Sequence, residues 1–307
     1  VLFILLTFIM PGCAFKGVDP AAFSSPELPA ARGLVFVPFF AQDRLQCGPA
    51  SLAAALTWSG VEVSPLQLKQ EVYTPGRKGS LQPDLKTAAR RRGRLAYEIS
   101  GLRELLQEMA AGNPVIVLQN LGLTWFPKWH YAVAVGYDLN KGRIFLHTGR
   151  QEAASRSIDL FSKTWKRSGY WGLVVLKPGS LPATAEQKHY LRAVLGLEQA
   201  GKLQAAVKGY EAALSCWPDS QTAAVGRGNC LYGLGDPKAA ADAFQQAAAV
   251  HPRSPEIYNN LAQTLLDRGR IKEALTAAQT AVRLGGPHRE ILKQTLQEIQ
   301  DAKARSE

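Results

Sequence analysis

The C-terminal third of the chain repeats itself every 34 residues, and this period constrains the fold more than any other feature of the sequence. The spacing is kept by three glycines and by two series of alanines, namely Gly201, Gly235 and Gly269; Ala206, Ala240 and Ala274; and Ala213, Ala247 and Ala281. A fixed period of this length indicates stacked helical units, because one unit alone cannot bury its apolar face. We therefore predict six helices in three antiparallel pairs over residues 187–288.

Each unit carries two further marks: a residue at a shared position in its second helix (Tyr210, Phe244 and Ala278) and a terminator at its exit (Pro218, Pro252 and Gly286). The pattern resembles the tetratricopeptide repeat, in three units. That resemblance implies an all-α solenoid with a protein partner on its concave face; the alternative is that the repeats only extend and stabilise the fold. Residues 289–307 place Leu292, Leu296 and Ile299 at helical spacing, which predicts a capping helix and tail.

Residues 34–180 show several helical patterns first and strand-like apolar runs afterwards, which indicates an α+β domain with an antiparallel sheet. We expect helices over 49–59, 64–72, 80–92 and 102–111, with Ser80 as the N-cap of the third. We expect strands over 35–40, 114–119, 130–137, 143–148 and 171–176.

This domain contains a Cys, a distant His and a nearby Gln in a pattern that suits acyl transfer. Cys47 lies where a helix is predicted to begin, and unpaired N–H groups at that position favour a thiolate. Gly48 lets another chain approach the sulfur, and Pro49 suits the first helical turn. His130 begins a predicted strand and is a candidate general base, whereas Gln42 is a candidate donor to an oxyanion together with the Cys47 N–H.

A Gln shortly before Cys-Gly-Pro-Ala, followed about 80 residues later by His-Tyr-Ala-Val-Ala-Val-Gly-Tyr-Asp, resembles the bacteriocin-processing (double-glycine) cysteine peptidases. The resemblance covers residues 34–177. It implies a papain-like fold in which Cys47, His130 and Gln42 are catalytic. It also implies cleavage of a peptide or protein substrate after small residues such as a Gly pair, without a cofactor or metal.

One position departs from that family, in which an Asp followed by Pro orients the His. Thr148 stands at about this place and is the candidate orienting residue, with Gln151, Glu152 and Asn120 as alternatives. An unoriented imidazole loses much of its advantage as a base. The rival hypothesis is therefore a non-catalytic adaptor, in which the papain-like domain binds a peptide without cutting it and the repeats scaffold an envelope complex.

The N-terminus resembles a bacterial lipoprotein signal. Residues 1–10 are an apolar run, VLFILLTFIM, followed by Pro11, Gly12 and Cys13. Met10 and Pro11 depart from the usual residues of the lipobox. The resemblance implies a signal segment over 1–13, lipidation at Cys13, a linker over 14–33 and a membrane attachment through the lipid, on the periplasmic side of the cell envelope. Ala14 after the Cys is typical of outer-membrane lipoproteins; the alternatives are an ordinary cleaved signal or an apolar stub.

The chain is basic, with 36 Lys and Arg against 25 Asp and Glu, giving a net charge of +11. The densest basic cluster, Lys86, Arg90, Arg91, Arg92 and Arg94, is interpreted first as a solvated helix face and second as a contact for anionic lipid. Nucleic acid is not an expected partner, because no recognition motif accompanies the charge. Cys216 and Cys230 are either buried thiols or a disulfide pair, and the remaining His residues lack the neighbours of a metal site.

Overall fold

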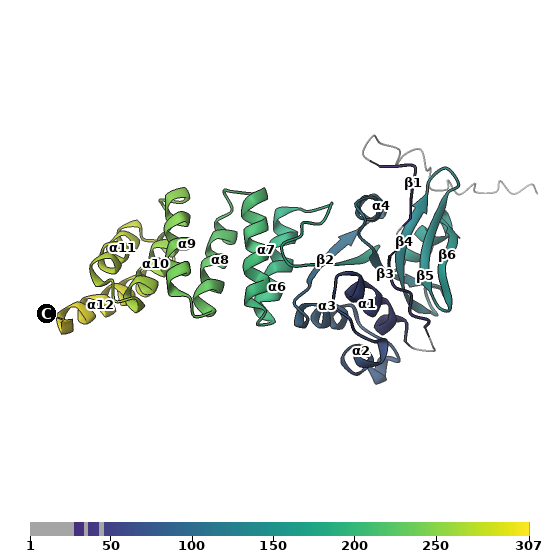
Figure 1. Cartoon of the computed structure of the whole chain (residues 1–307), viewed down its shortest axis with the longest axis horizontal. Helices are drawn as coiled ribbons and strands as arrows, with labels where there is room; N and C mark the ends of the chain where they lie inside the picture. The colour runs from purple at the N-terminus through teal and green to yellow at the C-terminus, as the bar shows by residue number, and fades with distance from the viewer. Residues whose placement is uncertain (1–27, 34–35, 43–45, 307) are drawn as a thin grey trace, which may run out of the picture.

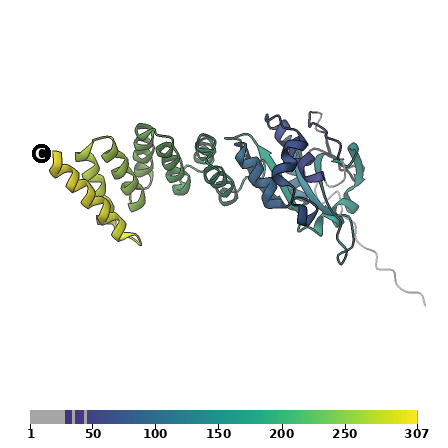
Figure 2. The same ribbon diagram turned by 90° about the horizontal axis from the view of Figure 1, so that it is seen from below.

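The computed structural model describes residues 28–33, 36–42 and 46–306. An α+β domain is followed by a row of paired helices that projects from one side of it, so that the molecule is elongated (Figures 1 and 2). The predicted combination of an α+β domain with an all-α repeat region is confirmed. The apolar run, Cys13 and most of the predicted linker lie outside the described residues. Within the described ranges, no helix has the length and apolar character needed to cross a membrane.

A seven-stranded antiparallel sheet forms the centre of the α+β domain. Its strand order is β2-β7-β3-β4-β5-β6, and β1 pairs with β4 outside this path. The strands are β1 (Ala31–Gly33), β2 (Leu95–Ser100), β3 (Val115–Asn120), β4 (Trp129–Asp138), β5 (Arg143–Thr148), β6 (Gln151–Ser157) and β7 (Trp171–Leu176). The long strand β4 lies between β3 and β5, and His130 is near its beginning.

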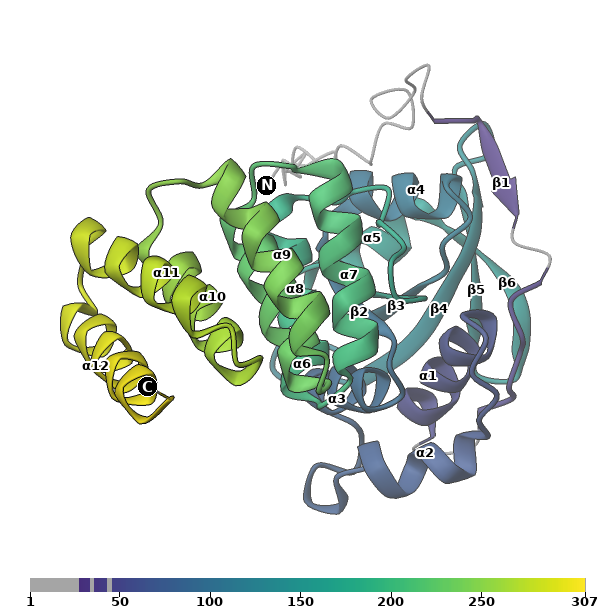
Figure 3. The ribbon, with the colours of Figure 1, turned by 60° about the vertical axis from the view of Figure 1, so that its left-hand side comes forward.

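Helices cover both faces of this sheet, and each face has its own apolar core. One core joins the sheet to α1 (Cys47–Trp58), α2 (Pro65–Val72) and α3 (Gln82–Arg91), whereas the other lies against α4 (Leu102–Ala110) and α5 (Ile158–Lys166). Nine consecutive residues of α1, from Gly48 to Leu56, are buried, because the helix packs between the sheet and its neighbours (Figure 3). A helix that is apolar all round in this way belongs in a protein interior.

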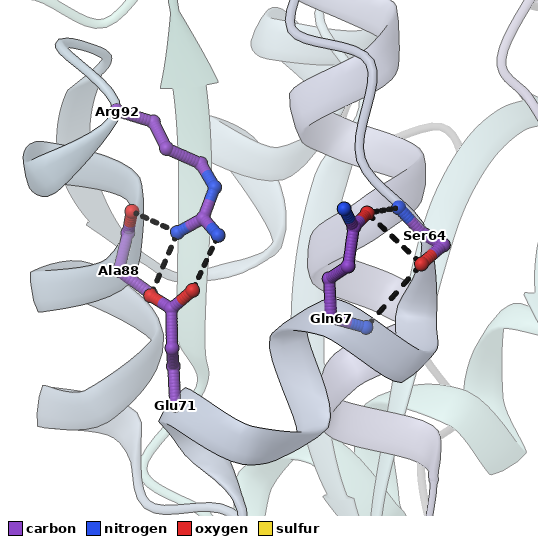
Figure 4. A network of polar contacts seen from close by, with 5 residues as sticks. All are labelled: Ser64, Gln67, Glu71, Ala88 and Arg92. Carbon is purple, nitrogen blue, oxygen red and sulfur yellow. Dashed lines mark hydrogen bonds and ion pairs between the residues drawn. The ribbon is translucent and has the colours of Figure 1, made fainter.

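Polar contacts cap the start of α2 and join α2 to the end of α3, as Figure 4 shows. At the start of α2, the Ser64 hydroxyl accepts from the N–H of Gln67, and the Gln67 side chain accepts from the N–H of Ser64, which is a complete capping box. At the end of α3, Arg92 donates to both carboxylate oxygens of Glu71, at 2.8 and 2.5 Å. Part of the basic cluster is thus engaged within the fold rather than facing solvent alone.

The structure corrects several local predictions. Ser80 is not the N-cap of α3: the helix begins after Leu81, without a side-chain cap. Residues 36–40 are not a strand, whereas Ala31–Gly33, expected to be linker, pairs with β4. This pairing is possible because Gly136 has no side chain: a Cβ there would lie 2.3 Å from the carbonyl oxygen of Arg32. Strands β2 and β6, helix α5 and the single turn η2 (Pro75–Arg77) were not predicted.

The repeat region contains the six predicted helices in three stacked pairs, followed by the capping helix. They are α6 (Gln187–Gln199), α7 (Leu203–Cys216), α8 (Gln221–Gly233), α9 (Pro237–Val250), α10 (Pro255–Asp267), α11 (Ile271–Leu284) and α12 (Arg289–Ser306). The three periodic glycines, Gly201, Gly235 and Gly269, all have φ between +70 and +78°, a conformation that glycine adopts without strain. Cys216 and Cys230 are free thiols, the first exposed and the second buried, so they form no disulfide.

The first repeat is continuous with the α+β domain. Helix α6 packs on β2 and α3, and one apolar core includes Leu95 and Tyr97 of the sheet together with Tyr190 and Leu197 of α6. The segment between the two parts is also anchored, because Thr184 donates to Glu108 through its N–H and its hydroxyl. The repeats are therefore attached through a packed interface.

Candidate active site

The three residues selected from the sequence line one cleft. It has a volume of about 1060 Å³ and is bordered by Gln42, Cys47 and His130, from the segment before α1, the first turn of α1 and the start of β4. The two residues are close together because the start of β4, which carries His130, lies beside the N-terminal end of α1, which carries Cys47. Among the described residues, no hydrogen bond joins the thiol to the imidazole; such bonds are often looser before a substrate binds.

Cys47 is half-buried at the first position of α1. Its sulfur receives backbone hydrogen bonds from Tyr131 and Gly48, which lower the pKa of the thiol, but burial is the larger effect and raises the pKa above its ordinary value. The position at the helix start by itself predicts a stabilised thiolate. In the structure, desolvation outweighs those N–H groups, so the resting sulfur carries its proton at neutral pH.

The His130 ring is held from the neighbouring strand by Thr148. Its Nε2 lies 2.7 Å from the Thr148 Oγ1, and this contact is available because β5 runs beside β4. Burial lowers the pKa of His130, and the positive charge of Lys128 lowers it further. The imidazole is thus neutral near pH 7 and able to take a proton. Because Thr148 engages Nε2, Nδ1 is the nitrogen left for that role.

Two of the alternative orienting residues have other partners. The Asn120 side-chain oxygen accepts from the N–H groups of Gly122 and Lys128, both at 2.9 Å, and so stabilises the loop before β4. Gln151 accepts from Arg156 at 2.6 Å, and Glu152 is exposed. Of the four candidates, Thr148 is the one that contacts His130 in the structure.

The Gln42 side chain is buried and fixed by Gly149, the residue after Thr148. Its Oε1 accepts from the Gly149 N–H at 3.0 Å, while the backbone N–H of Gln42 donates to the Gly149 carbonyl at 2.8 Å. With Oε1 occupied, the Nε2 amide group is the part of Gln42 that remains to donate toward the cleft. The end of β5 therefore positions two site residues, His130 through Thr148 and Gln42 through Gly149.

Several cleft residues were missed by the sequence analysis. Tyr131 supplies the N–H that holds Cys47, and its hydroxyl donates to the carbonyl of Ser80. The segment around Ser80 comes so close to α1 that a Cβ on Gly48 would lie 2.4 Å from the Ser80 Oγ. The Pro75-Gly76 pair marks a loop in the sequence, but no local signal places that loop over the cleft.

The loop before His130, residues 125–129, carries three aromatic side chains and lines the cleft only in part. Pro127 and Trp129 line it, whereas Trp125 and Phe126 are 81% and 71% exposed. No group of three or more His, Cys, Asp or Glu side chains suitable for a metal is found among the described residues.

Comparisons with known proteins agree with both parts of the chain. A model of the Peptidase_C39 like family matches residues 35–172, and a tetratricopeptide repeat model matches residues 191–245 and 231–288. A search of curated proteins found no match.

Three solved structures illustrate the similarity. A candidate C39-like peptidase from Bacillus anthracis is 20% identical, covers 48% of this chain and 98% of its own length, and has a TM-score of 0.42. The Yersinia enterocolitica secretion chaperone SycD, in complex with a peptide of the translocator YopD, is 20% identical over 38% of this chain and 93% of its own, with a TM-score of 0.35. The Sgt2 repeat domain of Aspergillus fumigatus is 19% identical over 40% and 82%, with a TM-score of 0.37. From the two family models, the chain carries a Peptidase_C39-like domain followed by tetratricopeptide repeats.

Proposed function

We propose that this protein is a cysteine peptidase that cleaves peptide bonds through Cys47 and His130. The observation that supports the proposal is the anchoring of the cleft: Thr148 holds the His130 ring, and Gly149 holds the Gln42 amide, in the lining that also contains Cys47. A cleft with a thiol, a neutral imidazole and an oriented amide donor contains the groups that acyl transfer from a peptide requires.

The directions of the pKa shifts favour a route that starts from a neutral pair. His130 Nδ1 takes the thiol proton as the sulfur of Cys47 attacks the carbonyl carbon, and the carbonyl oxygen becomes an oxyanion. The Gln42 Nε2 group and the Cys47 N–H donate to that oxygen. Collapse expels the amine, which receives the proton from His130 and leaves a thioester. Water, deprotonated by His130, then hydrolyses the thioester and restores the thiol.

We also propose that the repeats bind the substrate protein or a partner, and that Cys13 is lipidated at the bacterial cell envelope. Support for the first comes from the tetratricopeptide match, and support for the second comes only from the N-terminal residues. Metabolic labelling with a fatty acid tests the lipid: label in the wild type and none in Cys13→Ser is expected, whereas no label in either excludes it.

The peptidase proposal is tested with a peptidyl acyloxymethyl ketone ending in Gly-Gly and with a peptide library. The wild type is expected to react at Cys47 and to cleave after small residues, whereas Cys47→Ala and His130→Ala do neither. Gln42→Ala slows hydrolysis by about 10²–10³-fold, the usual effect of one oxyanion donor. Gln42→Glu is the matched control, since it keeps an oxygen for Gly149 but loses the amide donor; it is expected to be equally slow. A wild type that cleaves no peptide and reacts no faster than His130→Ala contradicts the proposal.

The second candidate function is the peptide-binding adaptor. The observation that favours it is Thr148 in the place where the family resemblance leads us to expect a carboxylate. An adaptor binds the same peptide in the wild type and in Cys47→Ala and releases it uncut from both.

A further inference from the structure

The walls of the cleft are strongly cationic. Four of its lining residues are Arg77, Lys78, Lys128 and Arg167, and no Asp or Glu is among the described residues that line it. They come from three places: the loop between α2 and α3, the loop before β4, and the end of α5. Cations from separate segments that converge on one cleft create a local positive potential, which a low-dielectric wall strengthens.

Three of these cations have no acidic partner in the part of the chain that the structure describes. Arg77, Lys78 and Lys128 are exposed and form no ion pair there, whereas Lys86 of α3 and Arg92, just after it, are paired with Glu98 and Glu71. Arg167 differs, because it donates to the carbonyls of Asn120 and Gly122 and thereby stabilises the loop that carries Lys128. The positive charge of these four residues is therefore not neutralised by ion pairs with acidic side chains of the described residues.

Lys78 is presented by a strained turn. Its backbone lies in the left-handed region, with φ 49° and ψ 39°, which a residue with a Cβ adopts less readily than glycine. The turn is closed by the N–H of Thr74, which donates to the carbonyl of Gly79, and by the N–H of Lys78, which donates to Pro75. Of the described residues, only Ala153 and Tyr170 share a positive φ without being glycine. A lysine kept in such a conformation beside a cleft suggests that its side chain has a role.

The positive charge of Lys128 acts electrostatically on His130, the candidate base. It contributes to the lowered pKa of His130, and the backbone N–H of Lys128 is fixed by Asn120. The cleft, at about 1060 Å³, is slightly larger than the range of about 300–1,000 Å³ for small-molecule sites, and it suits a peptide segment better than a small anion.

We propose that this cleft selects acidic peptides, and that Arg77, Lys78 and Lys128 pair with carboxylate side chains that flank the segment bound beside Cys47. As a statement about substrates, the inference rests on the proposed peptidase function, but the binding preference itself does not require cleavage. The residues named determine which peptide is bound and take no part in bond breaking.

The experiment uses two fluorescein-labelled peptides that differ only in charge. One has two Glu on each side of Ala-Gly-Gly-Ala, and its twin has Gln at the same four positions. Binding to full-length Cys47→Ala protein is measured by fluorescence anisotropy at low and high salt. We expect the acidic peptide to bind about tenfold more tightly at low salt, and salt to reduce the difference. The triple variant Arg77→Gln, Lys78→Gln and Lys128→Gln is expected to reduce it to less than about twofold.

A matched control removes the same number of charges elsewhere. Lys141→Gln, Lys177→Gln and Arg253→Gln replaces two exposed lysines and one exposed arginine outside the cleft lining, and we expect it to keep the preference. Equal affinity for the twins, binding of neither, or an equal loss in the control triple would overturn the proposal. Cleavage is measured separately with wild-type protein: selective binding without cleavage contradicts the peptidase function alone, whereas cleavage of both twins with equal kcat/KM contradicts the acidic preference alone.

Discussion

At the scale of single residues, the partner of His130 is a hydroxyl. A carboxylate only accepts hydrogen bonds and therefore holds a proton on the imidazole nitrogen that it faces, but a threonine hydroxyl both donates and accepts. The contact between Thr148 and His130 fixes the position of the ring, while the tautomer with a free lone pair on Nδ1 is less strongly favoured. A Thr at this position is thus compatible with a slow peptidase.

We predict that Thr148→Val lowers kcat by about tenfold or more while KM changes little, because the ring loses its hydrogen-bond partner but the cleft keeps its shape. Thr148→Ser is the matched control and is expected to retain most activity. Thr148→Asp is expected to raise the pKa of His130, seen as a shift of the acid limb of the pH profile to higher pH. Equal activity of Val and Ser variants would show that Thr148 does not position the ring.

The second residue-scale prediction concerns protonation. Burial raises the pKa of Cys47 and lowers that of His130, so both groups are neutral between their two pKa values. Iodoacetamide alkylation of Cys47 is therefore expected to keep increasing above pH 9, and exposed Cys216 is expected to react faster than Cys47 at pH 7. Mass spectrometry after timed alkylation measures both rates. A plateau for Cys47 already below pH 7 would show a preformed thiolate and imidazolium instead.

The lowered pKa of His130 also determines in which direction the stability of the fold changes with pH. Its folded pKa is below the unfolded value of about 6.5, so the unfolded chain binds this proton first as the pH falls. The stability associated with neutral His130 is full above pH 6.5 and is lost as the pH falls toward the folded pKa.

At the scale of elements, the repeats depend on glycines that face aromatic rings. In the first pair of units, Tyr210 of α7 packs against Gly226 of α8, where a Cβ would lie 2.4 Å from the ring; Phe244 of α9 makes the same kind of contact with Gly228. The aromatic ring thus occupies the space that a side chain on the neighbouring helix would need. This explains why small residues recur in these helices.

We predict that Gly226→Ala lowers the free energy of unfolding by about 1–3 kcal/mol, because the added methyl group overpacks the Tyr210 ring and outweighs the gain in helix propensity. Gly233→Ala, at the end of the same helix, is the control: its Cβ would meet only the terminal methyl of Leu203, at 3.0 Å. We expect that variant to be near neutral or slightly stabilised. Denaturant titration followed by circular dichroism measures both, and equal losses would contradict the packing argument.

At the scale of the whole molecule, the peptidase-like domain and the first repeat share a core. Tyr190, Val194 and Leu197 of α6 are fully buried in the cluster that also contains β2 residues. Since β2 is at one end of the sheet, α6 covers apolar surface that the domain alone would expose. The α+β domain therefore depends on its first repeat for stability, whereas the distal repeats have a separate core.

We predict that Leu197→Ala reduces the free energy of unfolding by about 2–5 kcal/mol and speeds amide hydrogen exchange in β2, about 100 residues earlier in the chain. Leu265→Ala, equally buried in the distal core, is expected to leave exchange in β2 unchanged. Hydrogen exchange with mass spectrometry measures both. Unchanged β2 protection in Leu197→Ala would show that the two parts are energetically independent.

Local patterns in the sequence were sufficient for the repeats and for most of the central elements. The 34-residue period predicted six helices because each unit repeats the same contacts with its neighbour, and β5 and β7 were predicted with the bounds that the structure has. Cys47, His130 and Gln42 were selected because the start of a helix, the start of a strand and a nearby amide side chain can each be recognised from a short stretch of sequence. These predictions needed only the order of residues along short segments.

The tertiary structure decided what depends on contacts between distant segments. The strand at Ala31–Gly33 exists because Gly136 lets it approach β4, and no pattern in three residues reveals such a partner. Thr148 meets His130 because β5 lies beside β4, and Gly149 meets Gln42 because the segment before α1 lies against the end of β5. The sequence also suggested a low pKa for Cys47 from the helix start, but burial by surrounding segments raises it. Desolvation depends on everything packed around a group, so it is known only once the chain has folded.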